Sequence, residues 1–160
     1  MSIIKITDQH REALRTLFES TWGSCLMVSR GAVHRLDKLP GFIFYEDEMI
    51  KGIITYHLAG KQCEIVSLDS FSENRGIGSS LLNALIELAN KEKWQLWLIT
   101  TNDNTRALHF YQKRGFRLSN IYWNAVDAAR KIKPEIPVMS SDGIPIQHEI
   151  ELVYQKDERG

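Results

Sequence analysis

Alternating strand and helix patterns in the middle of the chain constrain its fold most strongly. Residues 62–71 and 94–100 are rich in apolar side chains and predict strands, the second apolar enough to be covered on both faces. Residues 77–91 between them repeat apolar side chains at helical spacing, and residues 102–114 predict a second helix before a strand over residues 116–123. A strand–helix–strand–helix–strand order predicts an α/β domain in which helices flank a sheet.

The N-terminal part of the chain adds strands to this sheet. Residues 3–6 predict a short strand, and residues 41–45 and 49–58 predict a hairpin around an acidic turn. A helix is expected over about residues 8–20, whereas residues 21–39 show no clear periodicity.

The C-terminal part ends in a strand predicted over residues 146–154. Its alternation places His148 on the apolar face and Glu149 on the opposite, polar face. Residues 124–133 predict a helix, and the whole segment 124–146 is longer than a simple hairpin between two strands requires. We therefore expect this segment to do more than connect two strands.

Length and charge limit the classes of protein that this chain can belong to. It has 160 residues, so residues 1–160 are expected to form a single domain. Lys and Arg together number 20, as do Asp and Glu, which argues against a nucleic-acid partner. The N-terminus does not read as a secretory signal, and no apolar run approaches the roughly 18 residues of a membrane helix. We expect a cytoplasmic protein with no membrane partner.

Cys25 and Cys63 lack metal-ligand spacing, so we expect reduced thiols and no metal.

The turn after the strand at 62–71 carries the first chemical signal. A glycine-bearing turn that feeds a helix presents backbone N–H groups and the positive end of the helix dipole to an anion. Small residues let that anion approach closely, and here they are Gly76, Gly78, Ser79 and Ser80. The spacing is neither that of a P-loop nor that of a dinucleotide fingerprint. Alone, the turn is as compatible with an ordinary helix start as with a phosphate site.

A second segment, at the next helix, makes the pair of signals specific. Asn104 and Ala107 stand at the start of this helix, and Phe110, Tyr111 and Gly115 stand near its end. Together, in this order and after successive strands, the two segments resemble the motifs of the GNAT acyltransferase superfamily over about residues 64–116. The loop of that family begins with Gln or Arg where this chain has Glu73, so Glu73 is given no side-chain role.

The resemblance implies a fold and a ligand. The fold is a mixed α/β (α+β) fold of GNAT-like acyl-CoA acyltransferases, whose central sheet is splayed between two parallel strands and flanked by helices. The implied acyl donor is acetyl-CoA. Carried over residue by residue, the coenzyme would be bound by Leu68, Asp69 and Ser70 at the thioester end, by Asn74, Arg75, Gly76, Ile77, Gly78 and Ser79 at the pyrophosphate, and by Asn104, Ala107, Phe110 and Tyr111 beside the pantetheine arm.

The resemblance also implies transfer of an acetyl group to a primary amine by direct attack within a ternary complex. An alkylamine is mostly protonated at neutral pH, so the transfer needs a base for the amine and an acid for the departing thiolate. The resemblance gives the role of acid to Tyr111; the alternative is that Tyr111 only packs against its helix.

Glu64 is our first choice of base, because a glutamate early on this strand serves as base in relatives that resemble histone acetyltransferases. By regular alternation Glu64 would share a face with Val66 and Leu68, and an apolar setting would raise the pKa of its carboxyl. An ordinary exposed or ion-paired carboxylate is an equal alternative. Asp69, His148 and Glu149 are held in reserve as bases.

The acceptor is expected to be a small-molecule or peptide amine that the sequence does not identify. Side chains that could contact it are Trp22, Arg30, His34, Trp123, Asn124, Asp127 and Arg130, although packing or solvation is an alternative for each. We hypothesise that the segment 124–146 forms a lid over the acceptor.

A non-catalytic acyl-CoA-binding or sensing module on the same fold is the alternative function. Pairing of the last strand with a second copy, to give a homodimer, is also open.

Overall fold

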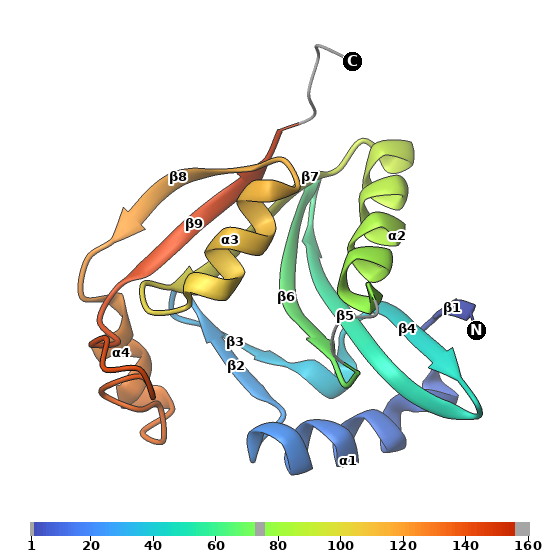
Figure 1. Ribbon diagram of the computed structural model, residues 1–160, viewed down its shortest axis with the longest axis horizontal. Coiled ribbons are helices and arrows are strands. Elements are labelled where there is room, and N and C mark those ends of the chain that lie inside the picture. The colour runs from blue at the N-terminus through green and yellow to red at the C-terminus, as the bar shows by residue number, and fades with distance from the viewer. Residues whose placement is uncertain (1, 73–75, 156–160) are drawn as a thin grey trace. The chain divides into compact units, whose positions relative to one another are not determined.

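The computed structural model describes residues 2–72 and 76–155 (Figure 1). The chain divides into two compact units, the first formed by Met1–Met27 and His34–Leu96 and the second by Val28–Val33 and Trp97–Gly160. This division does not test the expectation of a single domain, which stays a prediction.

The first unit contains an antiparallel sheet in the order β1-β4-β5-β6. Its strands are β1 (Ser2–Lys5), β4 (Gly41–Glu46), β5 (Met49–Ala59) and β6 (Gln62–Ser70). The expected hairpin is confirmed as β4 and β5, and the strand expected over 62–71 is confirmed as β6.

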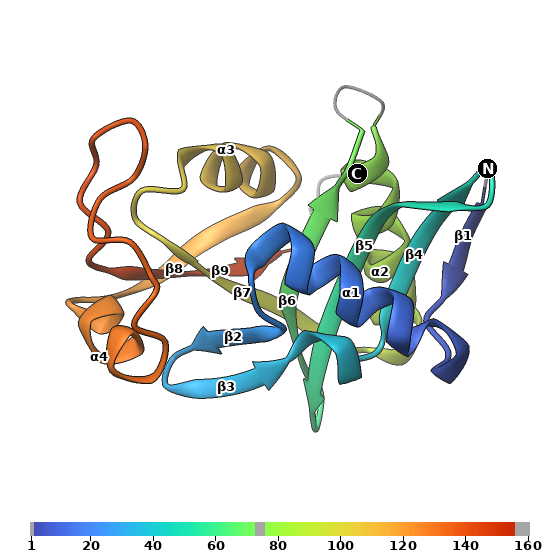
Figure 2. The same cartoon turned by 90° about the horizontal axis from the view of Figure 1, so that it is seen from below.

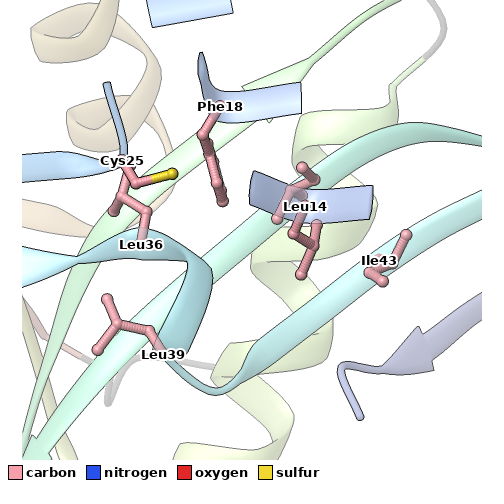
Figure 3. Close-up of a cluster of buried hydrophobic side chains, with 7 residues drawn as sticks. Leu14, Phe18, Cys25, Leu36, Leu39 and Ile43 are labelled. Atoms are coloured by element: carbon pink, nitrogen blue, oxygen red, sulfur yellow. The ribbon is translucent and has the colours of Figure 1, made fainter. Parts of the chain in front are cut away.

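Helices cover both faces of this sheet. A short 3-10 helix, η1 (Asp8–His10), leads into α1 (Arg11–Trp22), and α2 (Ile77–Glu92) lies behind the same strands (Figure 2). The amphipathic α1 buries its apolar side against β4 and β5. The buried cluster beneath it comprises Leu14, Phe18, Cys25, Leu36, Leu39, Ile43 and Ile53 (Figure 3).

Gly52 lets α2 approach the opposite face of β5. A Cβ at this position would lie 2.5 Å from Ile77 Cγ2 and 2.9 Å from Leu81 Cδ1, closer than packed side chains come. The absence of a side chain at Gly52 therefore sets where the first turns of α2 rest on the sheet.

Strand β6 contains a bulge in its middle. Thr55 of β5 pairs with Ser67, whereas the next residue of β5, Tyr56, pairs with Ile65, so Val66 is an extra residue. One extra residue changes which side chains share a face on its two sides.

Residues 21–39, where no periodicity was found, contain a hairpin. It consists of β2 (Leu26–Ser29) and β3 (Ala32–Arg35), and a 3-10 helix, η2 (Leu36–Lys38), follows. Arg30 and Gly31 at its tip have φ angles of 49° and 77°, the two positive values of a type I′ turn. Arginine is uncommon in a left-handed position, so the sequence carries no clear hairpin signal here.

The second unit contains three antiparallel partners in the order β7-β9-β8. They are β7 (Gln95–Thr101, whose first two residues belong to the first unit), β8 (Phe116–Tyr122) and β9 (Glu149–Tyr154). The expected helices are confirmed as α3 (Thr105–Lys113) and α4 (Ala125–Ile132). Within the described ranges, none of the helices combines the length and apolar character needed to cross a bilayer.

The last strand differs from its expected form. It begins at Glu149, and Glu149 is buried, with 3% of its surface exposed, although alternation put it on the polar face. The reason is a polar contact, since Glu149 Oε1 accepts a hydrogen bond of 3.2 Å from the Arg30 backbone N–H. His148 precedes the strand, and its Nδ1 accepts a hydrogen bond of 2.9 Å from the Asn124 backbone N–H.

Arg130 of α4 holds the loop that follows this helix. Its guanidinium donates to the carbonyl oxygens of Ile136, Pro137 and Ile146 at 3.2, 2.7 and 2.5 Å. It also contacts the Asp127 carboxylate at 3.0 Å. These contacts give Arg130 a structural role in the segment 124–146. The hypothesis that this segment is a lid stays a prediction.

Candidate active site

The start of α2 has the local structure of an anion site. Gly76 is its N-cap, with a left-handed φ of 71° and no side chain to cap the helix. The first turn of α2 carries no acidic residue, so nothing in that turn opposes the positive end of the helix dipole. The predicted pyrophosphate residues Gly76, Ile77, Gly78 and Ser79 therefore occupy a helix start that suits an anion. Asn74 and Arg75, predicted for the same role, lie outside the described residues, as does Glu73.

The bulge in β6 gathers polar side chains on the face that α1 covers. Ile53 of β5 packs in the cluster beneath α1, and Asp69 pairs with it. The polar residues on this face of β6 are Glu64, Ser67 and Asp69, paired with His57, Thr55 and Ile53. Thr55 and Ser67 join their hydroxyl groups in a buried hydrogen bond of 2.6 Å. Val66 also packs against the cluster beneath α1, so Glu64 shares this face with Val66 as expected. It does not share a face with Leu68, because the extra residue at Val66 shifts the alternation.

Glu64 lies in a buried cluster with two histidines. The exposed fraction is 5% for Glu64 and 7% for His34, which comes from β3. His34 Nε2 lies 3.4 Å from Glu64 Oε1, and the rings of His34 and His57 are 5.0 Å apart. His34 Nε2 makes no hydrogen bond within the described residues, so this contact is close without being well aligned. Glu64 is therefore a deeply buried carboxylate in contact with a histidine.

Asp69 lies on the same face, near the end of β6. Its carboxylate accepts a hydrogen bond from the side chain of Trp22, the last residue of α1. Its Oδ2 atom is buried and makes no hydrogen bond within the described residues. Burial raises the pKa of Asp69 to about 6, and the Trp22 hydrogen bond opposes part of that rise. Asp69 is therefore a carboxyl group that gains and loses its proton just below neutral pH.

Leu68 and Ser70 project to the opposite face of β6. They pair with Ile54 and Gly52, and Gly52 faces α2. Ser70 Oγ donates a hydrogen bond of 3.0 Å to the Ser72 carbonyl. The three residues predicted at the thioester end are thus neighbours along the strand, but only Asp69 points to the face that carries Glu64.

The residues predicted beside the pantetheine arm lie on α3, in the second unit. Asn104 is the N-cap of α3, and its Oδ1 accepts a hydrogen bond of 3.1 Å from the Ala107 N–H. The spacing of these two residues thus has a local structural reason. Phe110 lies beneath the Arg114 guanidinium, whose Cζ is 3.9 Å from the ring centroid.

Tyr111 packs in the interior of the second unit. Its exposed fraction is 7%, and its ring meets the rings of Phe110 and Phe116 edge-on at centroid distances of 5.1 and 5.2 Å. These contacts fix the orientation of the ring. The role of Tyr111 as an acid stays a prediction.

Sequence reasoning missed two pairings within the first unit. It named Trp22 and His34 only as acceptor contacts, and did not join them to Asp69 and Glu64. No periodicity in the sequence predicts the pairings of Trp22 with Asp69 and of His34 with Glu64. His34 follows a turn of unusual residues, and no residue pattern marks the bulge at Val66. The available signal was the presence of polar residues in an otherwise apolar strand.

Comparisons with known proteins identify the family of this chain. The sequence matches the profile of the Acetyltransferase (GNAT) family over residues 7–116. It is 44% identical over 157 residues to the uncharacterized protein YxbD of Bacillus subtilis (strain 168), covering 97% of this chain and 99% of the relative. The IAA acetyltransferase from Bacillus cereus ATCC 14579 has a similar structure, with a TM-score of 0.72 and 21% identity over 97% of this chain and 99% of that one. A GNAT family acetyltransferase from Elizabethkingia anophelis with acetyl-CoA bound gives a TM-score of 0.68 and 21% identity over 97% of both chains.

The fold and these matches define the protein as an acyltransferase. It belongs to the GNAT acetyltransferase family. The expected fold class is confirmed, with mostly antiparallel strands flanked by helices as in the solved structures. The expected splay between two parallel strands concerns the boundary between the two units and stays a prediction.

Proposed function

We propose that this protein transfers an acetyl group from acetyl-CoA to a primary amine of a small molecule or peptide. The observation that carries the proposal is the start of α2, where a left-handed glycine caps a long helix that has no acidic residue in its first turn. Family membership supports the same ligand, and the similar Elizabethkingia anophelis structure has acetyl-CoA bound.

The residues at this helix start fit a coenzyme A pyrophosphate. Backbone N–H groups at the beginning of α2 would bind its oxygens, aided by the helix dipole. Small side chains at Gly76, Gly78 and Ser79 leave room for that approach, and a Cβ at Gly76 would meet no atom of the described residues within 4 Å. Bound there, acetyl-CoA supplies an activated acyl carbon, and the protein supplies position and proton transfer.

Two proton transfers are required of the side chains. A carboxylate on the α1 face of β6 would remove a proton from the acceptor ammonium, and both Glu64 and Asp69 lie on that face. Tyr111 would donate a proton to the departing thiolate. No covalent enzyme intermediate is needed, so the reaction is direct attack within a ternary complex.

The test is thiol release from acetyl-CoA across a panel of amines, with the wild type, Tyr111→Phe and Tyr154→Phe. Tyr154 is a matched control, because its ring also packs against Phe116 while its hydroxyl has no proposed role. We expect amine-dependent release that Tyr111→Phe slows about 100-fold, with unchanged affinity for acetyl-CoA. Tyr154→Phe should keep most of the rate.

Three other results would contradict the proposal or parts of it. Coenzyme binding without release on any amine would favour a non-catalytic acyl-CoA sensor. Absence of coenzyme binding would refute the assignment of the α2 start. Equal rates for Tyr111→Phe and the wild type would refute the acid role alone.

A further inference from the structure

The α1 face of β6 presents two carboxylates with different surroundings. Glu64 is in contact with His34 and is almost fully buried. Asp69 has a hydrogen bond from Trp22 on one side and a buried oxygen without a hydrogen bond, within the described residues, on the other. A buried carboxylate oxygen without a partner is costly, and such groups are common at functional sites.

We infer that Asp69 is the group that takes the proton from the acceptor amine, and that Trp22 is the residue that positions it. The inference rests on the proposed N-acetyltransfer and names the base of that reaction. Glu64, by contrast, forms with His34 a buried polar pair that joins β6 to β3. Sequence reasoning ranked the two carboxylates in the opposite order.

The position of Trp22 supports this assignment. It is the last residue of α1, directly before Gly23, whose φ of 75° ends the helix. Its side chain is 55% exposed and at the same time bonds to Asp69. Trp22 therefore links this carboxyl group, whose Oδ2 atom is buried, to the solvent-facing end of α1.

Several charged or titratable groups lie on the α1 face of the sheet or on the elements that pack there. Asp69 shares this face of the sheet with Glu64 and His57; β3 and η2 contribute His34 and the Arg35–Asp37 ion pair, and α1 contributes Arg15 and Glu19, which interact with Cys25. Within the described residues, none of these groups contributes to the shift in the pKa of Asp69. Substitution of Trp22 should consequently change the pKa of Asp69 more than substitution of Glu64 does.

The proposed reaction balances in protons and bonds. The acceptor ammonium gives its first proton to the Asp69 carboxylate, and the free amine nitrogen bonds to the acyl carbon. The carbon–sulfur bond breaks, and the sulfur takes a proton from Tyr111. The nitrogen loses its second proton, which restores Tyr111, and Asp69 releases its proton to solvent. The products are the N-acetylated amine, coenzyme A with a free thiol, and one proton.

The test is the pH dependence of kcat/KM for the wild type, Asp69→Asn, Trp22→Phe and Glu64→Gln, using the best amine of the panel. In the wild type we expect activity to fall below about pH 6, where Asp69 becomes protonated. Asp69→Asn should lower kcat at least about 100-fold at pH 7 with unchanged affinity for acetyl-CoA. This deficit should shrink as the pH approaches the pKa of the acceptor, because the amine then needs no base.

Trp22→Phe and Glu64→Gln separate the base from its neighbours. Trp22→Phe removes a hydrogen bond that lowers the pKa of Asp69. The acid limb, which is the fall of kcat/KM at low pH, should therefore move to higher pH, while most of the maximal rate is kept. Glu64→Gln should keep the acid limb in place, whatever its effect on kcat.

Each contrary result has a definite meaning. If Asp69→Asn keeps both the rate and the acid limb, Asp69 is not the base, while the proposed acetyltransferase function stands. Loss of the limb in Glu64→Gln alone would assign the base to Glu64. No turnover of any amine by the folded wild type would instead refute the proposed function.

Discussion

Asp69, which we propose as the base, carries a cost in stability at neutral pH. Its carboxyl group is more easily ionised in the unfolded chain than in the folded protein, because burial raises its pKa from 3.8 to about 6. The folded state therefore binds more protons than the unfolded state between these two values. The contribution of Asp69 to stability is fully present below pH 4 and is lost as the pH rises through 6.

Asp69→Asn should consequently stabilise the protein at pH 8 and change its stability little at pH 4. The gain is at most about 3 kcal/mol, from the difference between 3.8 and about 6 and 1.36 kcal/mol per unit. Urea unfolding of both proteins at the two pH values measures it. Equal effects at pH 4 and pH 8 would show that Asp69 is not perturbed by burial.

At the scale of elements, the start of α2 is set by one backbone conformation. After glycine itself, asparagine and aspartate adopt the left-handed conformation of the N-cap at Gly76 more readily than other residues. These two side chains have the same shape and differ in charge, so they form a matched pair for testing an anion site.

Gly76→Asp should weaken acetyl-CoA binding at least about tenfold more than Gly76→Asn, because a carboxylate at the helix start repels the pyrophosphate. Calorimetric titration with coenzyme A measures the two Kd values. Both variants should be destabilised by a similar amount, of order 1 kcal/mol, which thermal unfolding checks. Equal Kd values for the pair would place the pyrophosphate elsewhere.

Elements with strong local signals could be predicted from the sequence, and those fixed by distant contacts could not. Helix α2 follows from the spacing of Ile77, Leu81 and Leu85, and α3 from the cap at Asn104. The β2–β3 hairpin was not predicted, because its turn has an arginine where asparagine or glycine is usual. The burial of Glu149 was also missed, since it depends on a bond to the Arg30 backbone from far along the chain.

The candidate site was predicted in part, for the same physical reason. Sequence motifs place candidate residues on β6 and at the starts of α2 and α3, and the roles of these residues stay predictions. Their relative orientation was not, because the bulge at Val66 leaves no mark on local composition. The contacts of Trp22 and His34 depend on packing of α1 and β3 against the sheet.

At the scale of the whole molecule, the balance of charge bears on how substrates arrive. The formal net charge is zero at pH 7, so the protein as a whole has no monopole to attract or repel a cationic amine.

We therefore expect kcat/KM for a monocationic acceptor to change less than about threefold between about 20 and 300 mM salt. Affinity for acetyl-CoA, which carries several negative charges, should fall over the same range and serves as the positive control. A fall of more than about tenfold in kcat/KM at saturating acetyl-CoA would contradict this expectation. It would indicate that negative charge at the acceptor site attracts the amine although the net charge of the protein is zero.

The extra residue at Val66 also shifts by one residue the alternation of side chains between the two faces of β6. Before it, even-numbered positions such as Glu64 are on the sheet face that α1 covers; after it, odd-numbered positions such as Ser67 and Asp69 are. A relative that lost this one residue could keep every motif on either side and still turn the carboxylate proposed as base toward α2. Comparisons of catalytic residues along this strand are therefore meaningful only when each half is counted from its own end.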